Sequence, residues 1–258
     1  MKKVATGGKC GYCSQSFSQN MFAKHLQSCK LRKELSPFLK KGQPSFLLGI
    51  NGKQFQDYWV FIEVNGNTCR LKDIDSFLRS LWLECCGHLS SFKINDQIYE
   101  SVPDPMYSTK SMQISVNKIL KEGTIFEYTY DFGSSTELII TVVSANDLPN
   151  DNNNMESPET KASKIARHVR EKKGKGKDSK VLPPVKLVAR NDPIVFICHA
   201  CKQVVATNIC TICLYEKSRK GASLCENCVR DHKCGEDMFL PIINSPRSGE
   251  CGYTGRFS

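Results

Sequence analysis

Apolar residues between positions 45 and 145 follow both strand-like and helix-like patterns. SFLLGI (45–50) and YWVFIEV (58–64) are rich in aromatic and branched side chains and predict strands. Further strands are predicted for HLSSFKI (88–94), IFEYTYDF (125–132) and TELIITVVSA (136–145). LKDIDSFLRSLWLECC (71–86) repeats apolar residues at spacings of three and four, which predicts an amphipathic helix that ends before Gly87. The mixture predicts an α+β fold, with a mixed sheet and packed helices.

Composition shifts along the chain predict four segments. A cysteine-containing finger occupies 1–32, and a basic connector leads from it to the α+β domain at 45–145. Residues 146–185 are rich first in Asn, Asp and Pro and then in Lys, which predicts a disordered basic linker. VKLVA, at 185–189, is a candidate strand, and a Cys/His-rich module follows at 191–258.

Charge is distributed unevenly over the 258 residues. Residues 1–41 hold nine Lys or Arg against one acid, and residues 161–190 hold eleven against two. Residues 42–160, between them, hold eight against sixteen. Basic segments beside zinc modules favour contact with the phosphates of nucleic acid. The alternative is a solvated surface that only keeps the protein in solution.

The sequence argues against a membrane span and a secreted disulfide framework. No run of 18 apolar residues occurs, and the basic N-terminus lacks an apolar signal segment, so a cytoplasmic location without membrane attachment is expected. Of the 14 cysteines, three lie between residues 10 and 29 and eight between residues 198 and 251, many in C-x2-C pairs. Such pairs in a cytoplasmic protein indicate metal binding.

The N-terminal cysteines have the spacing of a zinc finger. Cys10 and Cys13 form a C-x2-C pair, and His25 and Cys29 follow at helical spacing. Four such side chains provide the tetrahedral ligand set of a structural zinc ion. The motif resembles the Cys2His2 finger family in its Cys-Cys-His-Cys variant. That resemblance places Ser18, Met21 and Lys24 near the base-reading positions.

The C-terminal module contains ligands for two further zinc ions. Its candidates are Cys198, Cys201, Cys210, Cys213, Cys225, Cys228, His232, Cys234 and Cys251. They resemble cross-brace modules such as B-box and ZZ domains, in which the first and third pairs share one ion and the second and fourth share another. The resemblance implies one site of Cys198, Cys201, Cys225 and Cys228. The other site would hold Cys210, Cys213 and His232, completed by Cys234 or Cys251. A sequential pairing is the alternative. Three structural Zn²⁺ ions are therefore expected in the whole chain.

The central domain resembles the plasmid pRiA4b ORF-3-like family, whose members are described as transposon passenger proteins. Three features carry the resemblance: YWVFIEV (58–64) followed by the helix at 71–86, the motif Gly87-His88-Leu89-x2-Phe92, and the run FEYTYDFG (126–133). LPIINSPRSGECGYTG (240–255) resembles the tail of its zinc-bearing members. The family motif continues with an acid, a Trp and a His, where this chain has Ser134, Thr136 and Leu138. The resemblance implies an α+β fold and no secure reaction.

No motif for catalysis is present. The chain lacks a phosphate-binding glycine loop and a nucleophile elbow, and Cys69, Cys85 and Cys86 lack metal spacing and are expected to be small buried side chains. His88 and Asp131 are the polar candidates for an enzyme site. The favoured hypothesis is a non-enzymatic zinc-binding protein that acts as a nucleic-acid-associated or mobile-element accessory adaptor. A protein-interaction adaptor is the first alternative, and an enzyme that uses the central domain is the second.

Overall fold

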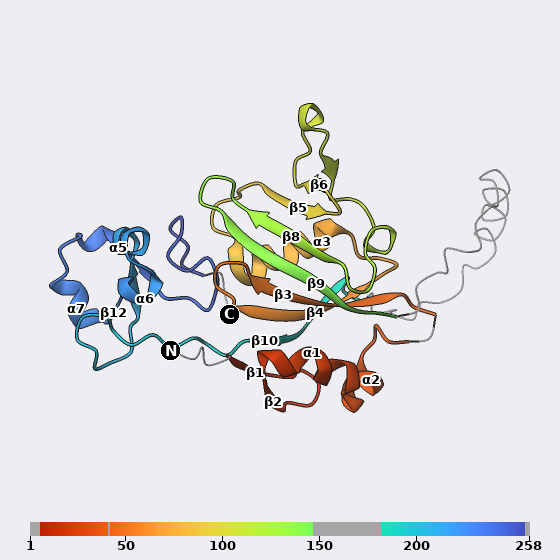
Figure 1. Ribbon diagram of the computed structural model, residues 1–258, viewed down its shortest axis with the longest axis horizontal. Coiled ribbons are helices and arrows are strands. Elements are labelled where there is room, and N and C mark those ends of the chain that lie inside the picture. The colour runs from red at the N-terminus through yellow and green to blue at the C-terminus, as the bar shows by residue number, and fades with distance from the viewer. Residues whose placement is uncertain (1–5, 41, 147–181, 256–258) are drawn as a thin grey trace, which may run out of the picture.

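An eight-stranded sheet forms the centre of the computed structural model, which describes residues 6–40, 42–146 and 182–255 (Figure 1). The spatial order of its strands is β10 (Val185–Arg190), β4 (Trp59–Asn65), β3 (Ser45–Gly52), β9 (Thr136–Asn146), β8 (Ile125–Tyr130), β5 (Ser90–Ile94), β6 (Gln97–Glu100) and β7 (Lys110–Ser111). Neighbouring strands are antiparallel, except β6 and β7. The predicted α+β class is confirmed, and the candidate strand at 185–189 lies at the edge of this sheet.

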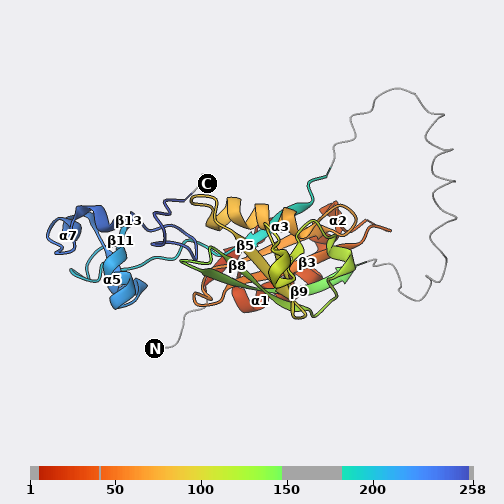
Figure 2. The ribbon, with the colours of Figure 1, turned by 90° about the horizontal axis from the view of Figure 1, so that it is seen from above.

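One face of the sheet packs against helix α3 (Leu71–Leu78) (Figure 2). Alternate residues of β3, β4, β8 and β9 point to this face and form the main core. The helix continues as a π-helix, η1 (Arg79–Leu83), and stops there, so the predicted helical end at Cys86 is wrong. Trp82 and Leu83 are buried, while Cys85 and Cys86 follow in a bend of the chain. Two short 3-10 turns, η2 (Pro105–Tyr107) and η3 (Val116–Lys118), lie between β6 and β8.

The finger covers part of the opposite face. It consists of the hairpin β1 (Gly7–Lys9) and β2 (Ser16–Ser18), helix α1 (Gln19–Ser28) and helix α2 (Lys30–Leu35). The ring centroids of Phe22 and Trp59 are 4.8 Å apart, in a second buried cluster that the finger shares with β3, β4 and β10. Gly8 permits this approach, because a Cβ there would lie 2.6 Å from the Trp59 ring. Strand β4 is therefore buried on both faces.

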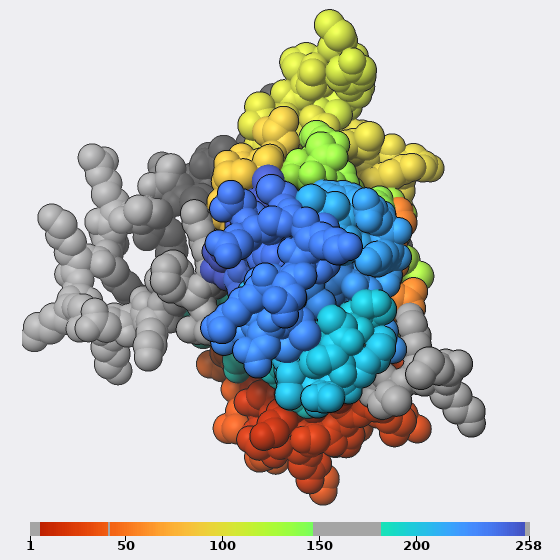
Figure 3. Space-filling view, turned by 90° about the vertical axis from the view of Figure 1, so that its left-hand side faces the viewer, coloured from red at the N-terminus to blue at the C-terminus, as the bar shows by residue number. Residues whose placement is uncertain are grey.

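The C-terminal module is built on a three-stranded sheet with the order β12 (Ser223–Leu224), β11 (Asn208–Cys210) and β13 (Phe239–Pro241). Short helices α5 (Thr211–Glu216), α6 (Arg219–Ala222) and α7 (Glu226–Arg230) and the 3-10 turn η5 (Glu236–Met238) surround it. Figure 3 shows the module in front of the central sheet, with the finger below it. Its two apolar clusters consist largely of cysteines and a few aliphatic residues.

Polar contacts join this module to the central sheet. The chain enters the module at Asn191 and leaves it at Asn244. Asn191 Nδ2 donates a hydrogen bond to Asn244 Oδ1 at 2.8 Å. Arg219 of α6 is buried, donates to the carbonyl of Pro246 at 2.9 Å and lies 4.0 Å above the Phe55 ring.

The predicted linker at 146–185 lies mostly outside the described residues. No helix within the described ranges is long and apolar enough to cross a membrane.

A buried carboxylate in α3 organises the main core. Asp75 is fully buried and accepts hydrogen bonds from Ser90 Oγ at 2.6 Å and Tyr128 Oη at 2.9 Å. Lys72 Nζ and Arg79 Nε lie 2.9 and 3.1 Å from its two oxygens. Burial alone would raise the pKa of Asp75, but these hydrogen bonds and charges outweigh it and lower the pKa below its ordinary value.

We expect Asp75→Asn to destabilise the central domain at neutral pH by roughly 1.5–3 kcal/mol, the contribution of hydrogen bonds to a charged group. Because the folded pKa lies below the unfolded value of about 3.9, the stabilisation by Asp75 is present above that value and is lost as pH falls through the folded pKa. Urea unfolding measured between neutral pH and pH 3 should give a flatter pH dependence for the variant. Equal slopes in variant and wild type would contradict this role.

Candidate metal centres

The four predicted ligands of the finger lie together. Cys10, Cys13, His25 and Cys29 place one ligand atom each within 4.8 Å of one another. The hairpin β1–β2 presents the two cysteines of the pair, and α1 presents His25, whose ring stacks on Phe17 at 3.9 Å. Cys29 follows the last residue of α1, so it belongs to the junction of the two helices and not to the helix itself. Cys13 Sγ lies 3.4 Å from His25 Nε2.

The C-terminal ligands form two groups with alternating pairs. One group contains Cys198, Cys201, Cys225 and Cys228, and the other contains Cys210, Cys213, His232 and Cys234. This is the arrangement that the cross-brace resemblance implies, and the sequential alternative is not observed. A tetrahedral zinc ion with Zn–S bonds of about 2.3 Å would set its sulfur atoms about 3.8 Å apart. The Sγ atoms of Cys213 and Cys234 are 3.9 Å apart, and those of Cys201 and Cys225 are 4.0 Å apart.

In the absence of a metal ion, the pKa values of these clustered thiols lie far apart. Burial would raise the pKa of Cys198, but backbone N–H groups directed at its sulfur lower the pKa to about 6. The pKa of Cys228 rises to about 12, chiefly because its thiol bonds to Cys225. Burial and the neighbouring thiols raise the pKa of Cys213 to about 11. A bound metal ion would deprotonate these thiols, because its charge offsets that of the ligating thiolates.

A fourth group of ligands was not predicted. Cys85, Cys86, His88 and Cys251 also place one ligand atom each within 4.8 Å of one another. Cys86 is exposed, so the expectation that it is a small buried side chain is wrong. Cys251, a candidate for the second C-terminal set, lies in this group instead. The signals in the sequence were the unpaired Cys-Cys-x-His run and one more cysteine than the C-terminal sites require.

Asp131 and Arg247 adjoin the fourth group. His88 Nε2 lies 3.4 Å from Asp131 Oδ2, so the two candidates for an enzyme site are neighbours. Arg247 is fully buried and donates from Nη2 to Asp131 Oδ2 at 2.6 Å and to Cys85 Sγ at 3.4 Å. Its Nη1 donates to the Ser134 carbonyl and to Thr136 Oγ1. Ser134 and Thr136 therefore both accept hydrogen bonds from this arginine.

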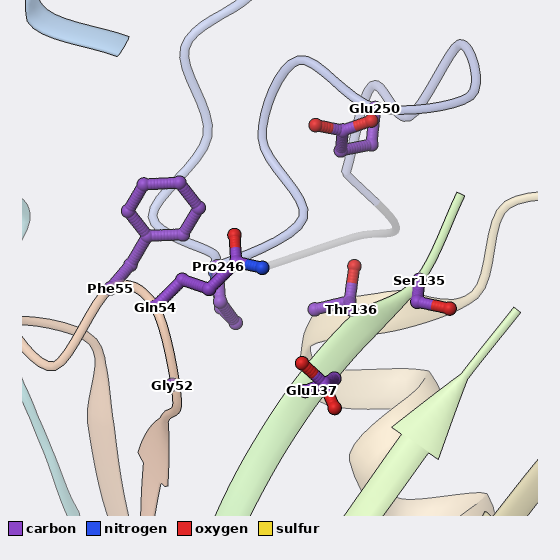
Figure 4. A pocket seen from close by; sticks show the side chains of 8 residues that line it. All are labelled: Gly52, Gln54, Phe55, Ser135, Thr136, Glu137, Pro246 and Glu250. Atoms are coloured by element: carbon purple, nitrogen blue, oxygen red, sulfur yellow. The ribbon is translucent and has the colours of Figure 1, made fainter. Parts of the chain in front are cut away.

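Two hollows adjoin the C-terminal module. Figure 4 shows the smaller one, between the β3–β4 loop, the start of β9 and the tail at Pro246 and Glu250. Its volume is about 20 Å³, which is room for about one water molecule and not for a substrate. The larger hollow, of about 640 Å³, lies beside the first C-terminal cysteine pair and is lined by Asp57, Val195, Phe196, Ile197, Cys198, His199, Lys202 and Lys220.

Comparisons with known proteins do not identify a family. No protein-family profile and no curated protein matches the chain. Among solved structures, it is similar to a protein of unknown function, MM3350 from Methanosarcina mazei Go1, with 16% identity and a TM-score of 0.31. The similarity covers 44% of this chain and 66% of that one. The resemblance to the pRiA4b ORF-3-like family stays a prediction.

Proposed function

We propose that the chain is a non-enzymatic zinc-binding protein in which three ions hold the finger and the C-terminal module in shape. The main observation in support of this proposal is that three compact groups each present four Cys or His ligands, of which three or more are cysteine. Thiolate-rich sets favour zinc over magnesium or calcium. Four protein ligands fill a tetrahedron and leave no position for a water molecule or a substrate, which is typical of structural zinc.

The partner that we propose is nucleic acid. The finger packs on the sheet through Phe22 and Leu26, and this leaves the opposite side of α1 exposed, including Met21 and Lys24. Lys30 and Lys33 of α2 are also exposed and add positive charge. The side of a finger helix that would face nucleic acid is therefore accessible and basic. In the family that the central domain resembles, such a protein would be a mobile-element accessory factor.

A salt series tests this proposal. We expect wild type to bind mixed-sequence DNA or RNA at low salt, with affinity that falls steeply as salt rises. The triple variant Lys24→Gln, Lys30→Gln, Lys33→Gln should bind more weakly. Its slope of log affinity against log salt should be flatter by up to about 2.7, because each phosphate contact with duplex DNA contributes about 0.9. Every sequence should weaken alike, because phosphate contacts do not read bases.

The matched control removes three exposed lysines from elsewhere on the central domain. Lys93→Gln, Lys110→Gln, Lys118→Gln changes the net charge equally but leaves the finger intact. If both triple variants lose the same affinity, only total charge matters and the finger is not the contact surface. If wild type binds neither DNA nor RNA at low salt, the nucleic-acid proposal fails.

One feature favours a protein partner as the second candidate. Val195 and Ile197 line the larger hollow and are 65% and 49% exposed, unlike most of the branched residues that the structure describes. Val204 and Val205 are each 50% exposed, and an isolated antiparallel β-bridge pairs Val205 with Ile197. An apolar surface of this kind is typical of protein-binding sites. Binding that persists at high salt and is lost in Val195→Ser, Ile197→Ser would favour this candidate.

A further inference from the structure

The fourth group of ligands differs from the other three in how far apart its members are in the sequence. Each of the other groups closes within one short segment, between residues 10 and 29, 198 and 228, or 210 and 234. Here Cys85, Cys86 and His88 follow helix η1 in the central domain, whereas Cys251 belongs to the C-terminal tail. An ion at this position would therefore connect two parts of the fold.

The geometry of the group fits a thiophilic divalent cation. The Sγ atoms of Cys86 and Cys251 are 3.8 Å apart, and those of Cys85 and Cys86 are 3.6 Å apart. Both values are close to the separation of about 3.8 Å that tetrahedral zinc imposes on two sulfur ligands. His88 Nε2 lies 2.9 Å from Cys86 Sγ and 3.2 Å from Cys251 Sγ, so one ring nitrogen faces both thiols. Three cysteines and one histidine are a zinc ligand set.

The surroundings of the group hold its ligands in place. Cys251 has φ +45°, a left-handed conformation that costs free energy for a residue other than glycine and persists where the surrounding structure requires it. Arg247, four residues earlier, places its buried guanidinium against Cys85 Sγ. Zinc with three thiolates carries a net negative charge, and the Arg247 guanidinium, which also pairs with Asp131, places positive charge beside it. Ser245 Oγ donates to the Trp82 carbonyl at 2.7 Å and aligns the same tail with the end of η1.

We propose that Cys85, Cys86, His88 and Cys251 bind a fourth zinc ion, and that this ion fastens the C-terminal tail to the central domain. The ion closes a loop of more than 160 residues, from Cys86 to Cys251, and so limits how far the tail and the C-terminal module can separate from the sheet. This site is independent of the nucleic-acid partner. It adds to the three structural ions and does not replace any of them.

The fourth ion is also the most accessible one. Cys86 and Cys251 are exposed, whereas no ligand in the other three groups is exposed. A chelator can therefore reach it first, and an alkylating reagent should modify these two thiols before the others. We expect one ion to leave the protein ahead of the remaining three when chelator is added in steps.

The test combines metal content with hydrogen exchange on the full chain. Wild type should contain four zinc ions by native mass spectrometry, and Cys86→Ser and Cys251→Ser should each contain three. Cys69→Ala is the control, because Cys69 lies outside all four groups, and it should keep four. In Cys86→Ser, the tail amides of Ser248, Glu250 and Tyr253 should lose protection, although the substitution is in the central domain and on the surface.

The outcomes separate this inference from the proposed zinc role. The fourth site would be overturned if wild type contained three ions and Cys86→Ser and Cys251→Ser contained three as well. The other three sites would still stand if metal were lost in Cys10→Ser, Cys210→Ser and Cys225→Ser. If wild type contained four ions but the tail amides of Cys86→Ser were as well protected from exchange as those of wild type, the ion would not fasten the tail to the central domain. One ion or none in wild type would overturn the proposed zinc role as well.

Discussion

Cys225→Ser is expected to remove at least one metal ion and unfold the C-terminal module while the central sheet stays folded. Cys225 belongs to the group with Cys198, Cys201 and Cys228, and the buried cluster around it contains two other buried residues, Cys198 and Leu224, of which only Leu224 is not a metal ligand. A module with so little apolar core depends on metal, whose apparent contribution is on the order of 10 kcal/mol per structural zinc site. Metal analysis should show the loss of at least one ion, because the second site of the module alternates with the first, and limited proteolysis should cleave within 193–243.

The matched control is Glu226→Gln, an exposed neighbour of Cys225 that is not a ligand. It should keep the full metal content and the protease resistance of wild type. Residues 45–145 should stay protected in both variants, because their core between α3 and the sheet is separate from the clusters of the module. Simultaneous loss of protection throughout 45–145 would show that the two parts unfold together.

The strands and the local ligand sets could be predicted because their signals are local. Alternating or continuous apolar runs predict strands at β3, β4, β8 and β9, and all four are present. A C-x2-C pair on a turn needs no information from the rest of the fold to indicate a metal ligand. For that reason the members of the finger site and of one C-terminal site lie together as their spacing indicates. The cross-brace pairing required the family resemblance as well.

The fourth ligand group could not be predicted from spacing. Cys86 and Cys251 are 165 residues apart, and the fold alone brings them to 3.8 Å. The π-helical turn at the end of α3 also matters, because it ends the helix at Leu83 and turns the two cysteines out of the helical register. A helix that continued to Cys86, as the apolar spacing predicted, would have placed them differently.

The sequence also did not predict where the finger packs on the sheet. The run YWVFIEV predicts a buried strand, but not what covers each of its faces. Ile62 packs toward α3, whereas Trp59 and Phe61 pack against the finger. Glu63 is on the finger side too, and it is only 1% exposed. A charged residue in a buried strand signals a buried partner, and the sequence does not say which residue that partner is.

The partner of Glu63 is Arg32 of helix α2. Arg32 Nε lies 2.6 Å from Glu63 Oε1, and both side chains are almost fully buried. Arg32 Nη1 also donates to the Leu26 carbonyl at 2.8 Å, and Ser36 Oγ donates to the second carboxylate oxygen at 2.8 Å. The hydroxyl of Tyr12 completes the network. Three segments of the finger region thus converge on one carboxylate of the sheet.

Arg32→Leu should therefore destabilise the protein strongly. The substitution leaves the Glu63 carboxylate buried without its cation, and removing one member of a buried ion pair costs about 3–5 kcal/mol. Lys33→Leu is the matched control, because Lys33 is the next residue of the same helix and is exposed, so its change should stay within about 0.5 kcal/mol. Urea unfolding can be followed by the fluorescence of the two tryptophans, Trp59 beneath the finger and Trp82 in the main core. Similar free energies of unfolding for the two variants would mean that this ion pair does not hold the finger to the sheet. A large loss in Arg32→Leu alone would make the finger a structural part of the central domain, with only its outer side left for a partner.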